Sequence, residues 1–156
     1  MHPNAAKVAD AARELGLEVE LREFPEGTRT AEDAARAIGV EVGQIVKSLV
    51  FTLDGEVVMA LVSGSNRLDE ARLAAVLDGA VVGRADADGV RAATGFAIGG
   101  VPPFGHPQPL PTAIDEDLLT YDEVWAAAGT PRDVFALAPA ELVRLTGGTV
   151  APLREA

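Results

Sequence analysis

The longest strand-like run of apolar positions spans residues 45–53, and one cation, Lys47, interrupts it. The pair Asp54-Gly55 follows, and such a pair between two apolar runs favours a tight hairpin turn. Residues 57–63 supply the second apolar run. The pattern therefore predicts a β-hairpin whose first strand carries Lys47, and we expect this strand to be central in its sheet and mostly buried.

Five other segments show the apolar spacing or the end signals of helices, and they span residues 5–15, 31–38, 70–78, 87–93 and 140–146. The residues suited to begin these helices are Asn4, Thr30, Asp69, Asp86 and Pro139. Thr30 with an aspartate three residues later resembles a capping box. Most of the segments end at a glycine, a residue that ends helices readily.

Shorter extended segments lie between these elements, at residues 17–22, 80–84, 96–98 and 110–115. Residues 121–128 are ambiguous, because their alanines favour a helix while the turn that follows favours a hairpin with residues 134–137. The irregular order of strands, helices and hairpins predicts an α+β fold with a mixed sheet. A length of 156 residues fits one domain over residues 1–156.

Composition narrows the function classes. The chain has 24 acidic and 13 basic residues, a net charge of −11, which argues against a protein that coats DNA or duplex RNA. It has no cysteine, which excludes thiolate metal sites, and its two histidines are too few and too distant in sequence to suggest a zinc site. We expect no cofactor. No apolar run reaches membrane-spanning length and no signal peptide begins the chain, so we expect a cytoplasmic protein without membrane contact.

Lys47 is unusual because the chain contains only two lysines, Lys7 and Lys47. Alternation along the strand places Lys47 on one face with Ile45, Leu49 and Phe51. An ammonium on such an apolar face reaches water along its stem, binds an anion, or lines a pocket. The run alone leaves open both a strand-edge lysine with its head in water and a lysine with a functional role.

The stretch Gly95–Pro107 is the second candidate for chemistry. Gly99-Gly100 permits backbone conformations and close approaches that a Cβ would block, and Pro102-Pro103 then stiffens the chain. Such a loop can hold unpaired backbone groups in a fixed geometry, as oxyanion holes do. The alternative is an ordinary glycine- and proline-rich connection.

The remaining candidates have simpler interpretations. The chain contains no nucleophile elbow, phosphate-binding P-loop, dinucleotide fingerprint or His-Glu-x-x-His motif. We expect Asp115 to form a turn or cap, Trp125 to lie in the core, and His106 to be a loop residue on the surface.

Two stretches form a pair of motifs: the first comprises Thr30–Ala35, Ile38–Val40 and Gln44–Phe51, and the second is the loop Gly99–Gly105. Together they resemble the YbaK/EbsC family, the free-standing relatives of the editing domain inserted in bacterial prolyl-tRNA synthetases. Gly99 and Pro103 match the ends of that family's G-x-x-x-P loop, and the resemblance runs from about residue 20 to 146. It implies a single α+β domain with a strongly twisted, barrel-like mixed sheet surrounded by helices.

The resemblance also implies a function, hydrolysis of the ester between a wrong amino acid and tRNA, most often tRNA for proline carrying cysteine, alanine or another small amino acid. The family's catalytic lysine falls on Lys47, and no metal is needed. The positions expected to bind substrate are Thr30, Gly99, Gly100, Val101, Pro102, Pro103, Phe104, Gly105 and His106. The expected partners are the aminoacylated acceptor end of tRNA and, in addition, an aminoacyl-tRNA synthetase; DNA is not expected to bind.

Departures from the family pattern keep two alternatives open. Val134 occupies the position where some relatives carry a functional aspartate, with Asp133 one residue earlier, and a glycine- and serine-rich segment of those relatives is replaced by residues 126–129. A non-catalytic module that binds the acceptor end or a synthetase, and a hydrolase of another small acyl ester, are the alternative functions. A basic rim formed by Arg29, Arg36, Arg67 and Arg84 would offset the acidic charge.

Overall fold

The computed structural model describes residues 1–28 and 30–156, so Arg29 of the expected basic rim lies outside the described residues. Its helices and strands are α1 (Pro3–Glu14), β1 (Leu21–Glu23), α2 (Ala31–Ile38), the 3-10 helix η1 (Val42–Gln44), β2 (Val46–Leu53), β3 (Glu56–Ser63), α3 (Glu70–Val76), β4 (Val82–Arg84), α4 (Ala87–Thr94), β5 (Thr112–Asp115), the 3-10 helix η2 (Glu116–Thr120), β6 (Val124–Ala127), β7 (Asp133–Leu137), α5 (Pro139–Thr146) and β8 (Thr149–Ala151).

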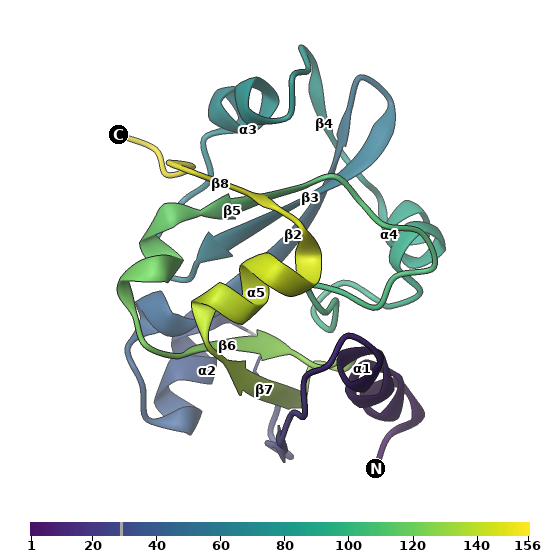
Figure 1. Ribbon diagram of the computed structural model, residues 1–156, viewed down its shortest axis with the longest axis vertical. Helices are drawn as coiled ribbons and strands as arrows, with labels where there is room; N and C mark the ends of the chain where they lie inside the picture. Colours follow the sequence, from purple (N-terminus) through teal and green to yellow (C-terminus); the bar gives the residue numbers. More distant parts are fainter. Residues whose placement is uncertain (29) are drawn as a thin grey trace.

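The strands form two sheets (Figure 1). The larger sheet has the order β4-β2-β3-β5-β8, and the smaller has the order β1-β7-β6. Strands β2, β3 and β4 pair antiparallel, whereas β5 is parallel to both β3 and β8. A parallel bridge between Ile45 and Trp125 connects the two sheets. The α+β class and the mixed pairing predicted from the sequence are confirmed.

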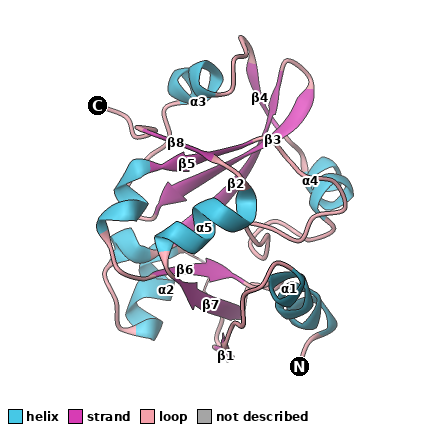
Figure 2. Cartoon of the chain, in the orientation of Figure 1, coloured by secondary structure: helices cyan, strands magenta, loops and turns pink. Residues whose placement is uncertain are grey.

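The main core lies between the two sheets. Its buried side chains come from β3 and β5 of the larger sheet and from β6 and β7 of the smaller one, and include Met59, Ile114 and Phe135. Helix α5 crosses in front of this space in Figures 1 and 2, and its buried Leu142 and Leu145 belong to the same core. A second apolar cluster covers the other face of the larger sheet under α3. The larger sheet is therefore packed on both faces.

The hairpin of β2 and β3 has the predicted turn. Leu53 pairs with Glu56, and Asp54 and Gly55 between them have φ angles of 52° and 87°, as a two-residue hairpin turn requires. The expectation that β2 is central and mostly buried is only half right. Only residues 51–53 of β2 also pair with β4, and the burial of residues 47–52 is intermediate. The half of β2 that carries Lys47 has β3 on one side only.

Several local predictions agree with the structure. Helix α2 spans Ala31–Ile38 as predicted, its N-cap Thr30 accepts a hydrogen bond from the backbone N–H of Asp33 at 3.0 Å, and Gly39 ends it with φ 89°. The sequence left residues 121–128 open between a helix and a hairpin, and in the structure Val124–Ala127 form the hairpin strand β6, which pairs with β7.

Other predictions were wrong at element ends. Helix α1 is capped by His2 and not by Asn4, since the Nδ1 atom of His2 accepts the Asn4 N–H at 3.0 Å. Residues 96–98 are not a strand, since a turn from Ala97 to Gly100 begins within them, and β8 was not predicted. In the described residues, none of the helices combines the length and the apolar character that crossing a membrane requires.

Candidate functional site

A cavity of about 450 Å³ lies where the open half of β2 faces α2, the β6–β7 hairpin and the loop around Gly99. Its walls come from four separate stretches and one glycine, namely Thr28, Thr30, Ala31, Glu32, Ala34 and Ile38; Ile45, Val46, Lys47, Ser48 and Leu49; Ile98, Gly99 and Val101; Trp125, Ala126, Ala127 and Val134; and Gly64. Most of these side chains are apolar. A volume of this size is typical of sites that bind small molecules.

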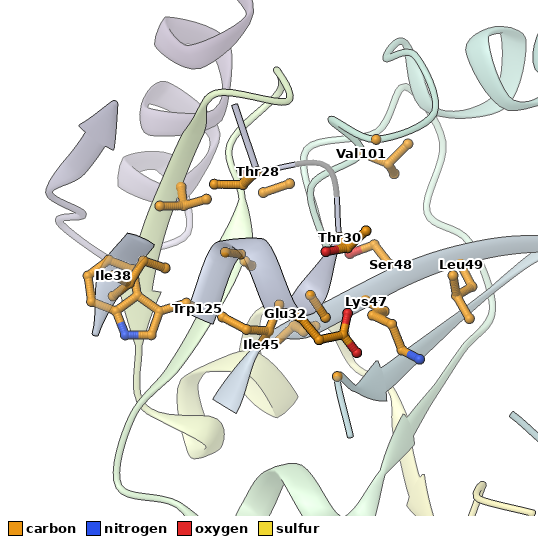
Figure 3. A pocket seen from close by; sticks show the side chains of 18 of the residues that line it. Thr28, Thr30, Glu32, Ile38, Ile45, Lys47, Ser48, Leu49, Val101 and Trp125 are labelled. Atoms are coloured by element: carbon orange, nitrogen blue, oxygen red, sulfur yellow. The ribbon is translucent and has the colours of Figure 1, made fainter. Parts of the chain in front are cut away.

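Lys47 lies at one end of this pocket, and Trp125 and Ile38 lie at the other (Figure 3). The half-buried Lys47 donates a hydrogen bond from Nζ to the backbone carbonyl of Asn66. Burial lowers the pKa of Lys47, while the charges of Glu32 and Asp115 act in the opposite direction and Arg67 adds to the lowering. The ammonium is thus held at a fixed point of the pocket with further N–H groups available to a ligand.

The start of α2 supplies the polar wall beside Lys47. Because Thr30 caps the helix, the first turn that follows lies along the cavity, and both Thr30 and Glu32 line it. The carboxylate of Glu32 lies between the Trp125 end and the Lys47 end in Figure 3. Thr30, predicted as a substrate-binding residue, is therefore at the pocket together with Lys47.

The glycine- and proline-rich loop reaches the pocket with its first part only. Gly99 has φ 94°, a conformation that L side chains rarely adopt, and both Gly99 and Val101 line the cavity. Gly100 packs against the β6–β7 turn, where an added Cβ would lie 2.8 Å from the Cα of Thr130. The two glycines therefore serve different purposes, a left-handed turn and a close backbone approach.

The second part of the loop faces away from the pocket. Pro102, Pro103 and Phe104 are buried, and the ring of Phe104 lies edge-on to Phe135 with centroids 5.6 Å apart. His106 donates from Nε2 to the carbonyl of Pro102 at 2.8 Å. These contacts hold the loop on the side away from the cavity. The cavity is not lined by six of the expected substrate-binding positions, namely Gly100, Pro102, Pro103, Phe104, Gly105 and His106.

His106 lines a different cavity, of about 270 Å³, together with Phe104 and residues of α1 and α5. His106, one of the positions expected to bind substrate, therefore does not line the cavity that contains Lys47. Burial lowers the pKa of His106, and its hydrogen bond to the Pro102 carbonyl acts in the opposite direction.

Several residues of the pocket were not expected there from the sequence, and Trp125 and Ser48 are two of them. Trp125 is 8% exposed, as a core residue would be, yet its ring also lines the cavity, and the guanidinium of Arg22 lies 5.4 Å from the ring centroid. Alternation along the strand predicts that Ser48 lies on the face opposite Lys47, yet both residues line the cavity. The hydroxyl of Ser48 and the Nε1 atom of Trp125 are buried without a hydrogen-bond partner in the described part of the chain. Adjacency to Lys47 was the only sequence signal for Ser48.

Within residues 1–28 and 30–156, no group of three or more histidine, aspartate or glutamate side chains is arranged to hold a metal ion. The arrangement instead offers one ammonium, backbone groups of a rigid loop and an apolar chamber. Positive charge and fixed dipoles of this kind can stabilise negative charge that develops on an oxygen atom. The apolar chamber can hold a small side chain beside them.

Comparisons with known proteins relate this geometry to one family. The sequence profile of the aminoacyl-tRNA editing domain matches residues 25–145, which include Lys47 and the Gly99 loop. A protein of Enterococcus faecalis, provisionally named Cys-tRNA(Pro)/Cys-tRNA(Cys) deacylase EbsC, is 31% identical over 126 residues, 80% of this chain and 76% of that protein.

Two further similarities agree with this match. The proline–tRNA ligase of Maridesulfovibrio salexigens is 34% identical over 132 residues, which are 82% of this chain but only 22% of that enzyme. The crystal structure of a provisionally assigned trans-editing enzyme for prolyl tRNA synthetase has a TM-score of 0.95 and 50% identity, and the match covers 100% of this chain and 99% of that one.

Proposed function

Because the chain belongs to the aminoacyl-tRNA editing domain family, we propose that it is a trans-acting deacylase that hydrolyses the ester of mischarged tRNA without a metal. The observation that carries this proposal is the position of the Lys47 ammonium, anchored to Asn66 at one end of an apolar pocket whose wall includes Gly99 and Val101. The relatives named as a deacylase and as a trans-editing enzyme support the same reaction.

In the proposed reaction, water attacks the carbonyl carbon of the ester that joins the amino acid to the terminal ribose. A tetrahedral intermediate forms, the bond between carbon and ribose oxygen breaks, and the free amino acid and a ribose hydroxyl are released. An activated ester needs little more than positioned water and stabilised charge. Lys47 supplies charge to the ester oxygen or the terminal phosphate, the loop backbone holds the aminoacyl group, and the neighbouring ribose hydroxyl of the substrate assists the water.

The composition of the pocket supports an amino acid with an apolar side chain as the group removed. Ala31, Ala126 and Ala127 line the chamber together with branched apolar residues, so a short side chain would lie against hydrocarbon. We propose alanine or cysteine on tRNA for proline as the first substrates to test. One methylene more or less in such a pocket changes binding by about 1–3 kcal/mol, which sets the discrimination that size alone can give.

The net charge of −11 limits how tRNA would be held. A deacylase that contacts only the acceptor end tolerates this charge, and its affinity would be weak and would fall with added salt. A synthetase partner that presents the charged tRNA would compensate for the weak affinity.

The alternative is a non-catalytic module that binds the acceptor end. It is favoured by one specific observation, since Val134 and Ala126 present apolar atoms to the pocket where some relatives have polar residues. Single-turnover hydrolysis with excess protein separates the two, because a binding module protects the ester and an editing enzyme cleaves it.

The first experiment is deacylation of tRNA for proline charged with alanine, cysteine, serine or proline, with the wild type beside Lys47→Ala. We expect hydrolysis of one mischarged species, sparing of prolyl-tRNA, and loss of the activity in the variant by about 10²–10³-fold. Competition by uncharged tRNA excludes a hydrolase of other small esters, which would ignore tRNA. Failure to cleave any species, or an unchanged rate in Lys47→Ala, would overturn the proposal.

A further inference from the structure

A fully buried carboxylate lies behind the Lys47 anchor. Asp115 ends β5 and has 0% exposure. A buried charge of this kind is tolerated only when its oxygens are hydrogen-bonded. Oδ1 accepts the backbone N–H of Asp117 at 3.0 Å and thereby caps η2, the role expected from the sequence. The cap uses only one oxygen of the Asp115 carboxylate, so the second oxygen is available for other hydrogen bonds.

The second oxygen of Asp115 ties a different strand to β5. Oδ2 accepts the backbone N–H of Ser63 at 3.0 Å and the side-chain amide of Asn66 at 2.8 Å. The same amide of Asn66 also donates to Oδ2 of Asp117 at 2.8 Å. Ser63 is the last residue of β3, and Asn66 lies in the loop that follows it. The end of β3 and this loop are therefore fastened to the end of β5 by carboxylates.

The backbone carbonyl of the fastened Asn66 is the group that accepts the hydrogen bond from Nζ of Lys47. A lysine side chain has a flexible four-carbon stem, so its ammonium has no fixed position without such an acceptor. We propose that Asp115 is a positioning residue that holds Asn66, and through Asn66 the Lys47 ammonium, at the pocket. The inference rests on the proposed function for the chemistry that Lys47 performs, but the chain of contacts stands without it.

Capping alone does not require this arrangement. An N-cap needs only a side-chain oxygen near the first backbone N–H groups of the helix, which asparagine or serine supplies equally well. A charged carboxylate that accepts hydrogen bonds from two other segments is a stronger restraint, since hydrogen bonds to ionised groups contribute roughly twice as much as neutral ones. The charge also lies near enough to Lys47 to act on its ammonium.

Two variants separate the positional effect of Asp115 on Lys47 from its electrostatic effect. Asp115→Asn removes the charge and places a donor where one of the two oxygens accepts hydrogen bonds. Asn66→Ala leaves the backbone carbonyl and the charge of Asp115 in place but releases the loop from both carboxylates. The matched control is Asp54→Asn, since Asp54 also links two segments, by accepting the N–H groups of Ala80 and Val81, at the opposite end of β2.

The first readout is deacylation, measured as separate kcat and KM values. We expect Asp115→Asn and Asn66→Ala to lower kcat by about tenfold to a hundredfold, as misplacement of a catalytic group does. Their KM values should stay near that of the wild type, and Asp54→Asn should keep wild-type kcat. A loss that follows thermal stability equally in all three variants would show a merely structural role and overturn the proposal.

The second readout does not depend on tRNA. With ¹³C-labelled lysine, the side chain of Lys47 can be titrated by NMR, and Lys7 serves as an internal control because these are the only two lysines. The groups that act on Lys47 are Glu32, Asp115 and Arg67. Removing the charge of Asp115 should lower the pKa of Lys47 further, whereas Asn66→Ala should change its chemical shift and line width with a smaller effect on titration.

These readouts distinguish the two proposals. If the wild type cleaves no aminoacyl-tRNA, the proposed function fails, and the titration still decides whether Asp115 and Asn66 position Lys47. If the wild type is active but both variants keep its kcat and its Lys47 titration, the positioning role is wrong while the deacylase remains. If Asp115→Asn does not fold, Asn66→Ala decides alone.

Discussion

Strand β2 has two halves that belong to one hairpin but differ in their surroundings. From Phe51 to Leu53 the strand lies between β3 and β4, and Leu53 is buried in the cluster under α3. From Val46 to Val50 the strand pairs with β3 alone, and its other side faces the cavity. Lys47 lies in the second half, six residues before the last residue of the strand.

The difference shows how one regular element supplies both rigidity and an accessible site. The paired half fixes the position of the strand, since its backbone pairs with β3 on one side and with β4 on the other. The open half is then held in place without being covered, so that Lys47 and Ser48 can both line a cavity. Sites on regular elements are more precisely placed than sites on loops. The following predictions test whether function and stability divide along the strand in this way.

The largest effect is expected from Lys47→Met, which keeps an unbranched apolar stem and removes the charge. We expect kcat to fall by about 10²–10³-fold, since one charge-stabilising group is lost. The folded protein should be as stable as the wild type or more stable at neutral pH, because burial of the ammonium lowers its pKa and so disfavours the folded state. Single-turnover deacylation and thermal unfolding measure the two quantities.

The matched control for this variant is Lys7→Met, which changes the other lysine and should leave kcat unaltered. A large loss of stability in Lys47→Met would contradict the assignment of function to the open half of β2 and of stability to the paired half. It would mean that the open half contributes to folding through its charged residue.

The opposite pattern is expected at the paired half. Leu53 is 7% exposed and packs where an added Cβ on Gly79 would lie 2.4 Å from its side chain. Leu53→Ala should lower the free energy of unfolding by about 2–5 kcal/mol through lost contacts and a cavity. Below the lowered melting temperature, kcat should remain near the wild-type value. Denaturant unfolding measures the loss of stability, and deacylation at low temperature measures kcat. A hundredfold loss of kcat in a folded Leu53→Ala variant would contradict the difference between the two halves of β2.

Sequence reasoning succeeded where the determining chemistry is local. The cap Thr30 and the stop Gly39 set the bounds of α2, and Asp54-Gly55 set the hairpin, because each acts through backbone groups a few residues away. The apolar run 96–98 predicts a strand that the structure does not contain. In the structure Phe96 is buried, Ile98 is 62% exposed, and the backbone turns toward Gly99.

The walls of the pocket could not be predicted in this way. Trp125 reaches the cavity because β6 lies beside the start of β2, a contact between residues 80 positions apart. Asp115 combines a contact that the sequence predicts with contacts that it does not. Its cap of η2 is local and was expected, whereas its hydrogen bonds to Ser63 and Asn66 join segments about 50 residues apart. Periodicity shows which side chains share a face, but not which segment covers that face.

The pH dependence of the reaction is the next test of the open half. Because burial lowers the pKa of Lys47 below its ordinary value of 10.5, the ammonium loses its proton at lower pH in the folded protein than in the unfolded chain. The enzyme-catalysed rate should fall about tenfold per pH unit above the folded-state pKa.

Stability should change in the other direction over the same window. Between the folded-state pKa and 10.5 the unfolded chain binds more protons at Lys47, so this residue's contribution to stability rises with pH. The fall of the catalysed rate above the pKa of Lys47 is measured from deacylation rates corrected for spontaneous ester hydrolysis. Lys47→Met is the reference, because its rate should not show this fall. A rate that keeps rising with pH after this correction would exclude a role for the charged lysine.

The smallest effect on stability is expected from Ser48→Ala. The hydroxyl of Ser48 is buried and has no partner within the described residues, so its removal breaks no hydrogen bond there. The free energy of unfolding should therefore stay within about 0.5 kcal/mol of the wild type or rise. The control is Ser63→Ala, because the buried hydroxyl of Ser63 donates to the carbonyl of Gly43 at 2.7 Å, and its loss should destabilise the protein by about 1–3 kcal/mol. Denaturant unfolding of both variants measures the difference. An equal loss in both would show that the open half of β2 is as strongly bound into the fold as the end of β3.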